Sequence, residues 1–326
     1  MASLIFREAF YVIISIMKHF EFTVTDEYAG ERIDKCISEL YEDFSRSYIQ
    51  KLIKDNLVFV AVNKEESKLS KSVKGSYILK EGNFVFFDTK ESIIPDIVPE
   101  DIPLDILYED SDVLVVNKPK GMVVHPAPGH YSNTLVNAVM FHVKDLSGIN
   151  GVLRPGIVHR IDMNTTGSLI ICKNDKAHID IAAQLKEHSI NRLYRAIVHG
   201  VINEDEGTVN KPIGRNEKDR KKMACNVANA KNAITHYKVL KRFKDYTYIE
   251  CKLETGRTHQ IRVHMASIGH PVLGDDVYST IKSPFKLLGQ TLHAMTLGFI
   301  QPSTREYIEV VAPLPEYFNN LLNILI

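Results

Sequence analysis

The sequence is poor in cysteine, and its charges cancel. Its 326 residues include four widely scattered cysteines, Cys36, Cys172, Cys225 and Cys251, and no two of them have Cys-x-x-Cys spacing. This spacing predicts neither a zinc site nor a disulfide framework, and it favours a reducing, cytoplasmic location. Lys and Arg number 40 and Asp and Glu number 40, so the formal net charge is zero. Any surface for a polyanion must therefore come from local patches rather than from bulk charge.

Long apolar runs and cofactor motifs are also missing. The apolar run at residues 9–16 is too short to span a bilayer, so no membrane association is expected. It is also a poor signal peptide, because Arg7 is next to Glu8 and no small-residue cleavage site follows. We expect residues 1–16 to be an extension without a role in the fold. No Gly-x-Gly-x-x-Gly, Gly-x-x-x-x-Gly-Lys-Ser/Thr or His-Glu-x-x-His occurs, so neither a nucleotide cofactor nor a metal is expected.

What is present describes a soluble chain of more than one domain. Hydrophobic residues make up 44% of the sequence and charged residues 25%, which is an ordinary globular balance. Three prolines between residues 91 and 103 predict an extended linker, because proline removes a donor and biases its neighbour to extended geometry. The expected organisation is a small domain over 17–90, a linker over 91–103 and a large domain over 104–326.

The small domain is predicted to mix strands and helices. Ile33, Ile37 and Leu40 lie at helical spacing, and so do apolar residues of a second helix that begins at the capping residue Ser45. The expected elements are strands over 20–24, 57–60 and 76–79 and helices over 30–40 and 45–53.

This small domain resembles the S4 type of RNA-binding module. The resemblance is carried by Arg32 and Asp34 on the first helix, by Ser45-Arg46-Ser47 at the start of the second, and by a short turn at 80–83. In such modules two short helices present cations to RNA phosphates, which gives affinity without base specificity. The residues implied here are Arg46, Lys51, Lys54 and Lys64.

The large domain is predicted to alternate buried strands with helices. A strand, an acidic turn and a second strand fit residues 104–119, and a terminal helix follows Pro315. Between them we expect helices over 134–142, 177–187 and 259–266 and strands over 168–172, 190–200, 234–240 and 247–253.

Asp162 stands at the centre of the most informative stretch, residues 156–167. Arg160 precedes it, a polar turn-forming run follows it, and the buried strand at 168–172 comes next. Loops mounted on a rigid scaffold are where catalytic residues tend to lie. An Asp that caps its own turn, through Asn164 and the threonines, fits the spacing equally well. Spacing alone leaves both interpretations open.

A second informative stretch, residues 254–266, carries an arginine on a predicted helix. Gly256 ends a strand, and Arg262 shares a helix side with His259. A buried arginine needs a carboxylate partner, and Asp162 is the candidate. The spacing of five between His259 and His264 does not fit a zinc helix.

Further basic positions point to a polyanion. The segment 211–222, which includes Arg215, is rich in Lys and Arg and is predicted to be a loop that could hold phosphates. His125, next to Pro126, is expected to be structural or to face RNA.

Six blocks of residues follow one another along the large domain: Asn117-Lys118-Pro119-x-Gly121-Met122-x-x-His125-Pro126, His159-Arg160-Ile161-Asp162-x-x-Thr165-Thr166-Gly167, Arg192-Leu193-Tyr194-x-Ala196, Gly256-Arg257-Thr258-His259-Gln260-Ile261-Arg262-Val263-His264, Gly269-His270-Pro271-Val272-x-Gly274-Asp275 and Leu292-His293-Ala294. In these blocks, the large domain closely resembles the RluA/RluD family of pseudouridine synthases. Met163 and Ile161 depart mildly from the family pattern, in which Lys and Leu are more frequent, and neither change touches the reacting group.

The resemblance implies an α+β fold with a mixed, mainly antiparallel central sheet flanked by helices and loops. It implies an isomerase that needs no cofactor, with Asp162 as the essential carboxylate, Tyr194 against the base and Arg262 paired with Asp162. The S4-like module favours large-subunit ribosomal RNA as the substrate, and a monomeric enzyme is expected. The positions implied to contact RNA are His159, Arg160, Lys118, His125, Arg215, Arg257 and His259.

Three other functions are alternatives to a pseudouridine synthase that acts on ribosomal RNA. A glycoside hydrolase would need a second carboxylate near Asp162, and the blocks supply cations and aromatics instead. A noncatalytic RNA-binding protein is disfavoured by the intact Asp162, Tyr194 and Arg262. A pseudouridine synthase that acts on transfer RNA is the serious alternative, because family members share these blocks and differ mainly in the RNA they modify.

Overall fold

The computed structural model describes most of the chain. The described residues are 16–41, 44, 46–67, 70–91, 97–126, 130–143, 146, 156–217, 219 and 222–325. The chain divides into two compact units, 1–95 and 96–326. The division falls inside the expected linker of 91–103. Residues 1–15 of the expected extension lie outside the described part, whereas Ile16 already belongs to the first strand.

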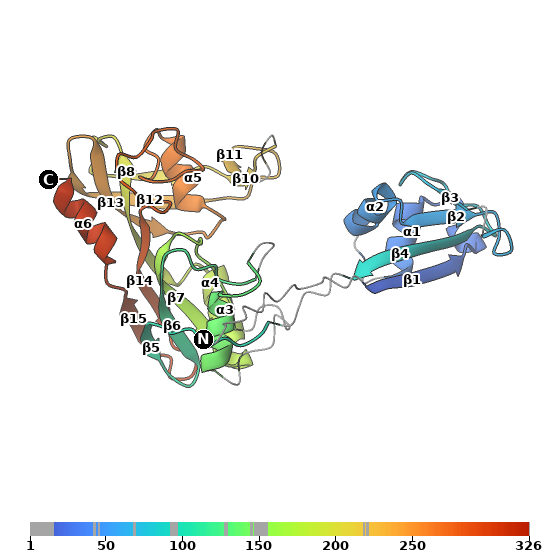
Figure 1. The fold of residues 1–326 in the computed structure, drawn as a ribbon, viewed down its shortest axis with the longest axis horizontal. Helices are drawn as coiled ribbons and strands as arrows, with labels where there is room; N and C mark the ends of the chain where they lie inside the picture. Colours follow the sequence, from blue (N-terminus) through green and yellow to red (C-terminus); the bar gives the residue numbers. More distant parts are fainter. Residues whose placement is uncertain are drawn as a thin grey trace, which may run out of the picture. The chain divides into compact units, whose positions relative to one another are not determined.

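The N-terminal unit is an antiparallel sheet with two helices, drawn in blue to cyan in Figure 1. The sheet order is β1-β4-β2-β3, so the strand expected over 20–24 is indeed at an edge. Its core joins the two helices to the sheet through Ile37, Ile49 and Phe87. The elements are β1 (Ile16–Thr23), η1 (Asp26–Tyr28), α1 (Ile33–Leu40), α2 (Arg46–Lys54), β2 (Val58–Ala61), β3 (Lys71–Ser72) and β4 (Phe84–Glu91).

One strand of this unit was predicted in the wrong place. The expected strand at 76–79 is reduced to a single bridge between Ile78 and Arg32. The long strand is β4, which pairs with both β1 and β2. Only its last residue, Glu91, falls in the segment expected as linker.

The C-terminal unit is built on a nine-stranded sheet in the order β5-β6-β7-β14-β8-β13-β12-β9, with β15 paired to β14. Only the β7–β14 pair is parallel, so the predicted mixed, mainly antiparallel sheet is confirmed. The elements are β5 (Ile106–Glu109), β6 (Val113–Lys118), α3 (Leu135–His142), β7 (Thr166–Cys172), α4 (Asp175–Lys186), β8 (Asn191–His199), β9 (Glu206–Asn210), β10 (Ile213–Arg215), β11 (Met223–Cys225), β12 (Ile234–Arg242), β13 (Tyr246–Leu253), α5 (Gln260–Ser267), β14 (Leu292–Ile300), β15 (Tyr307–Val311) and α6 (Glu316–Ile324).

Helices cover both faces of this sheet. On one face, α3 and α5 pack over β6, β7, β8 and β13 in the largest core cluster. On the other face, α4 packs over β6, β7 and β14, and α6 packs over β8. Every residue of β7 is buried, as its apolar sequence predicts for a strand covered on both sides. The second half of the expected linker belongs here, since Ile97 joins the core and the Val98 carbonyl accepts a hydrogen bond from Asn137 of α3.

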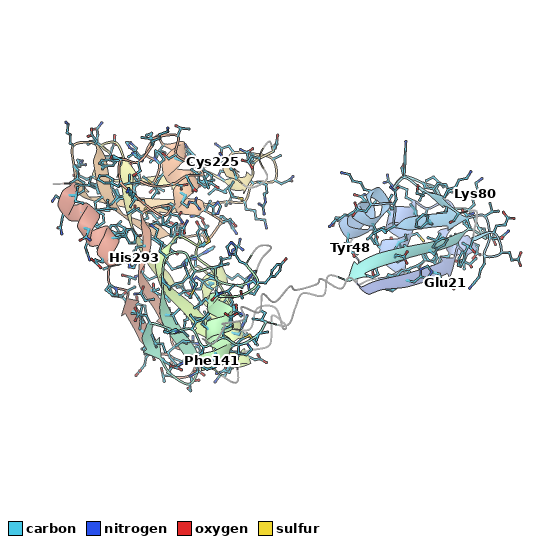
Figure 2. All side chains as sticks on the ribbon, in the orientation of Figure 1. Glu21, Tyr48, Lys80, Phe141, Cys225 and His293 are labelled. Atoms are coloured by element: carbon cyan, nitrogen blue, oxygen red, sulfur yellow. The ribbon has the colours of Figure 1, made fainter. Side chains whose placement is uncertain are left out.

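The register of β14 fixes the segments around the predicted site. His293 and Ala294 lie opposite Thr166 and Gly167 of β7, while Ala294 also lies opposite Tyr194 of β8. The His293 ring and the Thr166 hydroxyl share a hydrogen bond at 2.8 Å in the interior of the unit. Figure 2 labels His293 within this unit. Gly167 has a φ of 108°, and a Cβ there would collide with the Ala294 backbone. Glycine is therefore required where the loop that carries Asp162 enters the sheet.

Candidate active site

The loop before β7 holds Asp162 by its backbone and leaves its carboxylate available. The Asp162 carbonyl accepts a hydrogen bond from the Thr165 amide at 3.0 Å, which closes the turn. The Asp162 carboxylate takes no part in that turn, and its Oδ2 accepts from Nη1 of Arg262 at 2.9 Å. The turn expected at Asp162 is therefore present, but its backbone carbonyl closes it in place of the expected side-chain cap.

Arg262, in the first turn of α5, bridges two carboxylates. Its Nε and Nη2 donate to the two oxygens of Asp275 at 2.7 and 2.9 Å, and its Nη1 reaches Asp162. The side chain of Asp275 is fully buried and that of Arg262 is 5% exposed, whereas that of Asp162 is 24% exposed. Asp275 therefore fixes the guanidinium in the interior through two hydrogen bonds. Nη1 of Arg262 donates to the carboxylate of Asp162 at the cavity.

The surroundings of Arg262 and Asp275 favour the charged form of both side chains. Burial alone would raise the pKa of Asp275, but hydrogen bonds from Arg262 and from the amides of Tyr278 and Val277 outweigh it and lower that pKa. Burial opposes the charge on Arg262, while Asp275 and Asp162 raise its pKa overall. A positive charge thus remains fixed 2.9 Å from Asp162.

The pair of Asp162 and Arg262 was predicted from the sequence, whereas the role of Asp275 was not. Asp275 belonged to one of the family blocks, but no partner was assigned to it. The number of donors could have indicated a second carboxylate, because a guanidinium has five donors and a buried one needs more than a single carboxylate.

His259 closes the site at the start of α5. It occupies the N-cap with a φ of 57°, in the left-handed region. Its Nδ1 lies 2.7 Å from the Tyr278 hydroxyl, and its Nε2 lies 3.8 Å from Oδ1 of Asp162. Burial lowers the pKa of His259, and Asp162 opposes that effect. The imidazole therefore lies beside the carboxylate as a neutral neighbour.

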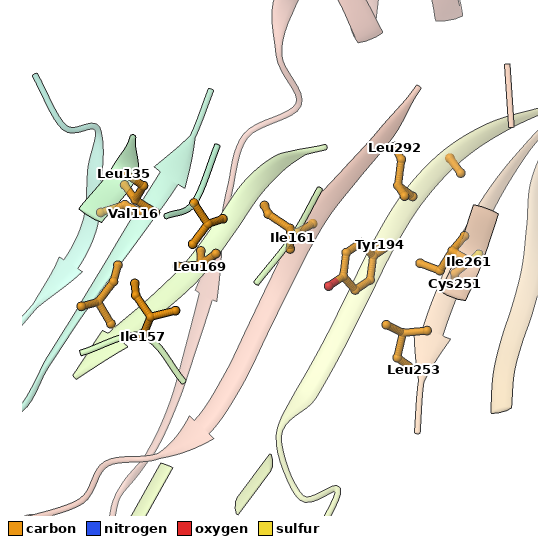
Figure 3. Close-up of a cluster of buried hydrophobic side chains, with 14 of the residues drawn as sticks. Val116, Leu135, Ile157, Ile161, Leu169, Tyr194, Cys251, Leu253, Ile261 and Leu292 are labelled. Atoms are coloured by element: carbon orange, nitrogen blue, oxygen red, sulfur yellow. The ribbon is translucent and has the colours of Figure 1, made fainter. Parts of the chain in front are cut away.

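Tyr194 forms part of the wall next to Asp162. It lies on β8, is 8% exposed, and belongs to the core cluster on the α3–α5 face. Figure 3 shows its ring within this cluster, with the hydroxyl oxygen turned toward the side of Ile161. Burial raises the pKa of Tyr194, Arg192 opposes the shift and Asp162 adds to it.

Two cavities meet at Asp162. One, of about 460 Å³, is lined by Tyr194, Arg192 and Arg257. The other, of about 380 Å³, is lined by His125 and Met163. Both are also lined by Arg160, Ile161, Asp162, Thr258, His259 and Arg262.

Five of the predicted RNA-contact residues line these cavities: His125, His159, Arg160, Arg257 and His259. Arg160 is exposed, and its Nη2 lies 3.4 Å from the Thr258 hydroxyl. Arg257 donates to the Asn232 carbonyl at 2.9 Å. His159 instead accepts a hydrogen bond from the Ile170 amide at 3.2 Å, and burial together with Arg192 lowers its pKa to about 3. The structure therefore gives His159 a role in fixing the loop to β7.

Lys118 corrects one prediction. It was expected to contact RNA, yet it is completely buried. Its Nζ donates to the carbonyls of Pro119, Met122 and Met163 at 2.8, 2.8 and 3.0 Å. Burial lowers the pKa of Lys118 to about 7, and Asp162 opposes the shift. The side chain ties the loop after β6 to the residue that follows Asp162.

Replacement of Lys118 by Met tests this structural role. The three carbonyls would lose a donor, so the free energy of unfolding should fall by about 2 kcal/mol. The salt dependence of RNA affinity should stay as in the wild type, because no phosphate contact is removed. Urea denaturation and RNA titrations at several salt concentrations measure both. A reduced salt dependence with unchanged stability would restore the original prediction.

The remaining predicted contacts lie on other elements of the two units. Arg215 is exposed on β10, in a short β10–β11 hairpin where a loop was expected. In the N-terminal unit, Lys51 and Lys54 are exposed in the last turn of α2. Lys64 is paired with Glu21 at 2.8 Å.

Arg46 is organised by a buried carboxylate, Asp34. The Asp34 side chain is fully buried and accepts from Arg32 at 3.0 Å, from Arg46 at 3.2 Å and from Gln50 at 2.8 Å. Burial alone would raise the pKa of Asp34, but these hydrogen bonds lower it well below its ordinary range. Arg32 and Arg46 are thereby held together at the surface of this unit, each about half exposed.

The described residues contain neither a group of metal-binding side chains nor a helix suited to a membrane span. Within this part of the chain, no group of three or more His, Cys, Asp or Glu side chains is arranged to hold a metal ion. No helix in the same residues has the length and apolarity that a membrane span requires.

Comparison with known proteins gives one consistent family. Residues 112–267 match the family model described as RNA pseudouridylate synthase. The chain is 49% identical over 306 residues to the uncharacterized RNA pseudouridine synthase YlyB of Bacillus subtilis, covering 94% of this chain and 98% of that protein. It is 43% identical over 312 residues to ribosomal large subunit pseudouridine synthase D of Zymomonas mobilis, covering 93% and 96%. The solved structure of human RNA pseudouridylate synthase domain containing 1 is similar with a TM-score of 0.54 and 25% identity, over 69% of this chain and 96% of that one.

Proposed function

Because the chain belongs to the RluA/RluD family of RNA pseudouridine synthases and is therefore an isomerase that acts on RNA, we propose that it modifies uridines of large-subunit ribosomal RNA. The proposal for this substrate is supported by relatives named for the large ribosomal subunit, which the chain matches over more than nine-tenths of its length. We also propose that the enzyme works in the cytoplasm, where ribosomal RNA is found.

The reaction breaks the N1–C1′ bond of uridine, turns the base and joins C5 to C1′. The proton lost from C5 balances the proton gained by N1, so no oxidant or reductant is consumed. A base inside folded RNA cannot be reached, so it must be flipped out, at a cost of a few kcal/mol. The single observation that carries the proposal is the cavity of about 460 Å³ that is lined by Asp162, Tyr194 and Arg262 together.

Asp162 is proposed as the essential carboxylate. It either adds to C1′ as a nucleophile or removes the 2′ proton as a base, and its geometry suits both. Arg262 orients this carboxylate through the hydrogen bond at 2.9 Å. Asp275 acts one step further away, as the positioning residue that fixes the guanidinium.

Tyr194 is proposed to contact the base. Its ring can stack on uracil, and its hydroxyl can relay the C5 proton. Since burial raises the pKa of Tyr194, the hydroxyl is protonated near neutral pH and serves as a relay rather than as a phenolate base. Arg160, exposed beside Thr258 at the cavity, is proposed to occupy the space that the flipped base leaves.

The N-terminal unit is proposed to be an S4-like RNA-binding module. Two features support this: Asp34 holds two half-exposed arginines together, and α2 presents Lys51 and Lys54 to solvent. Such an array would contact phosphates and add affinity without base specificity.

A charge-reversal variant tests the N-terminal unit. Lys51→Glu combined with Lys54→Glu should weaken binding to ribosomal RNA and reduce the salt slope of the binding constant by about 2. The single-turnover rate at saturating RNA should stay unchanged, because the catalytic unit is intact. Lys35→Glu is the matched control, since Lys35 is already paired with Glu31 on α1. An unchanged affinity in the double variant would remove the support for an RNA-binding role of α2.

The choice of RNA is tested directly with purified protein. Transcripts of large-subunit ribosomal RNA and of transfer RNAs are incubated with the enzyme, and pseudouridines are mapped in each. Site-specific modification of the ribosomal transcript alone is the expected result. Modification of transfer RNA alone would overturn the substrate and keep the reaction.

A further inference from the structure

Arg192 is a buried cation that the proposed mechanism does not use. It lies on β8 and is 7% exposed. Its Nε is enclosed without a hydrogen-bond partner, and no carboxylate among the described residues pairs with its guanidinium. Burying an unpaired charge costs free energy, so we expect such a residue to gain its partner when a ligand binds.

Gly256 leaves room for this arginine. A Cβ on Gly256 would lie 2.9 Å from Nη1, 3.8 Å from Cζ and 3.9 Å from Nη2 of Arg192. The backbone of Gly256 does not have the positive φ that would itself demand glycine. The space left by the missing side chain of Gly256 is thus the space next to the guanidinium of Arg192.

Arg192 and Tyr194 lie on the same face of β8, two residues apart, and both line the cavity of about 460 Å³. Among the described residues, the only carboxylate that lines this cavity is Asp162, whose Oδ2 is already bound to Arg262. The other cations differ in position: Arg160 and Lys186 are exposed, and Arg257 donates to a backbone carbonyl. Arg192 is therefore the recessed, unpaired cation of the cavity wall.

We infer that Arg192 binds a carbonyl oxygen of the uracil ring and stabilises the negative charge that the ring acquires when the N1–C1′ bond breaks. This inference rests on the proposed function. A backbone phosphate stays with the RNA strand, so it suits an exposed cation, whereas the flipped base is the part that enters the cavity. Arg192 would then be a catalytic residue of the oxyanion-stabilising kind.

The electron balance locates the charge that Arg192 meets. The electron pair of the N1–C1′ bond leaves with N1 and is delocalised onto O2 and O4. When the ring has turned, C5 supplies the pair for the new C5–C1′ bond as Asp162 leaves C1′, or as C2′ regains its proton if Asp162 acted as a base. C5 then loses its proton, and N1 takes one up. Arg192 stays protonated throughout, so it changes the stability of the detached ring and not the proton count.

Arg192→Met in the full-length enzyme tests the inference. The single-turnover rate should fall by roughly 100-fold or more, as when one oxyanion-hole donor is removed. The Kd for RNA should change by less than about threefold, because phosphate contacts dominate affinity. The melting temperature should hold or rise, since an uncompensated buried charge is removed. Arg192→Lys should recover part of the rate.

A substrate change separates catalysis from structural support. RNA that carries 6-azauridine at the target has a more acidic base, whose anion is more stable, so the loss caused by Arg192→Met should be smaller with it. Arg195→Met is the matched control on the opposite face of β8, where Arg195 pairs with Glu250. It should keep the wild-type rate with both substrates.

The possible outcomes are distinct. A wild-type rate in Arg192→Met overturns the inference and leaves the proposed function standing. An equal loss with both substrates together with a lowered melting temperature also overturns it, because that pattern marks a structural residue. A wild-type enzyme that modifies no RNA overturns the proposed function and this inference with it.

Discussion

Asp162→Asn is expected to abolish isomerisation, with a fall in the single-turnover rate of about 10⁴-fold or more, the scale on which an essential nucleophile or base is lost. The amide is nearly the same size and can still accept the hydrogen bond that Arg262 donates. It can neither add to C1′ nor take a proton from C2′. The loss should therefore lie in the chemical step, measured by pseudouridine formation with enzyme in excess over RNA.

The matched measurement is RNA affinity. Since Asp162 carries a negative charge that faces the RNA cavity, its removal should leave the Kd unchanged or slightly lower. Full activity in Asp162→Asn would remove the carboxylate from the mechanism. A parallel loss of activity and affinity would point to a misfolded loop instead.

Arg262→Ala is expected to have the largest effect on stability. It leaves Asp275 buried without its ion-pair partner, and breaking a buried pair in this way costs about 3–5 kcal/mol. Activity should fall as well, because Asp162 loses the donor at 2.9 Å that orients it. Urea denaturation of the C-terminal unit gives the free energy of unfolding. Arg305→Ala is the control, since Arg305 pairs with Asp180 at the surface, and it should cost less than about 1 kcal/mol.

The effect of Arg262→Ala should depend on pH in a defined direction. In the wild type the pKa of Asp275 is lowered, so its contribution is present above the unfolded pKa of about 3.9 and is lost as pH falls through the lower folded value. Without Arg262, burial raises that pKa, and the folded variant takes up a proton. Its deficit in stability should therefore narrow between pH 8 and pH 5. A deficit independent of pH would mean that Asp275 is not its source.

The elements of the C-terminal unit were predictable because their signals are local. The buried strand after Asp162 was visible as an uninterrupted apolar run, and it corresponds to β7, which has no exposed residue. The helix expected over 134–142 is present as α3, and Thr134 is its N-cap. The prediction of a strand over 76–79 was wrong, because a short apolar alternation does not reveal its pairing partner. In the structure, β4 pairs with both β1 and β2.

The site was predictable in its members and not in its connections. An arginine on a buried helix face demanded a carboxylate, which gave the pair of Arg262 and Asp162. Nothing local reveals that Asp275 would accept two hydrogen bonds from the same guanidinium, because that depends on how residues 268–278 fold back over α5. Lys118 failed for the same reason: a lysine that satisfies three carbonyls in the interior has the same sequence signal as one that faces solvent.

The measurement that tests the central claim most directly is a map of pseudouridines in the ribosomal RNA of cells that lack this protein. The map is repeated after the wild type or Asp162→Asn is returned. We predict that specific pseudouridines of the large-subunit RNA disappear on deletion, return with the wild type and stay absent with Asp162→Asn. Identical maps in the parent strain, the deletion strain and the two strains that receive the wild type or Asp162→Asn would contradict the account. Sites restored by Asp162→Asn would contradict it as well.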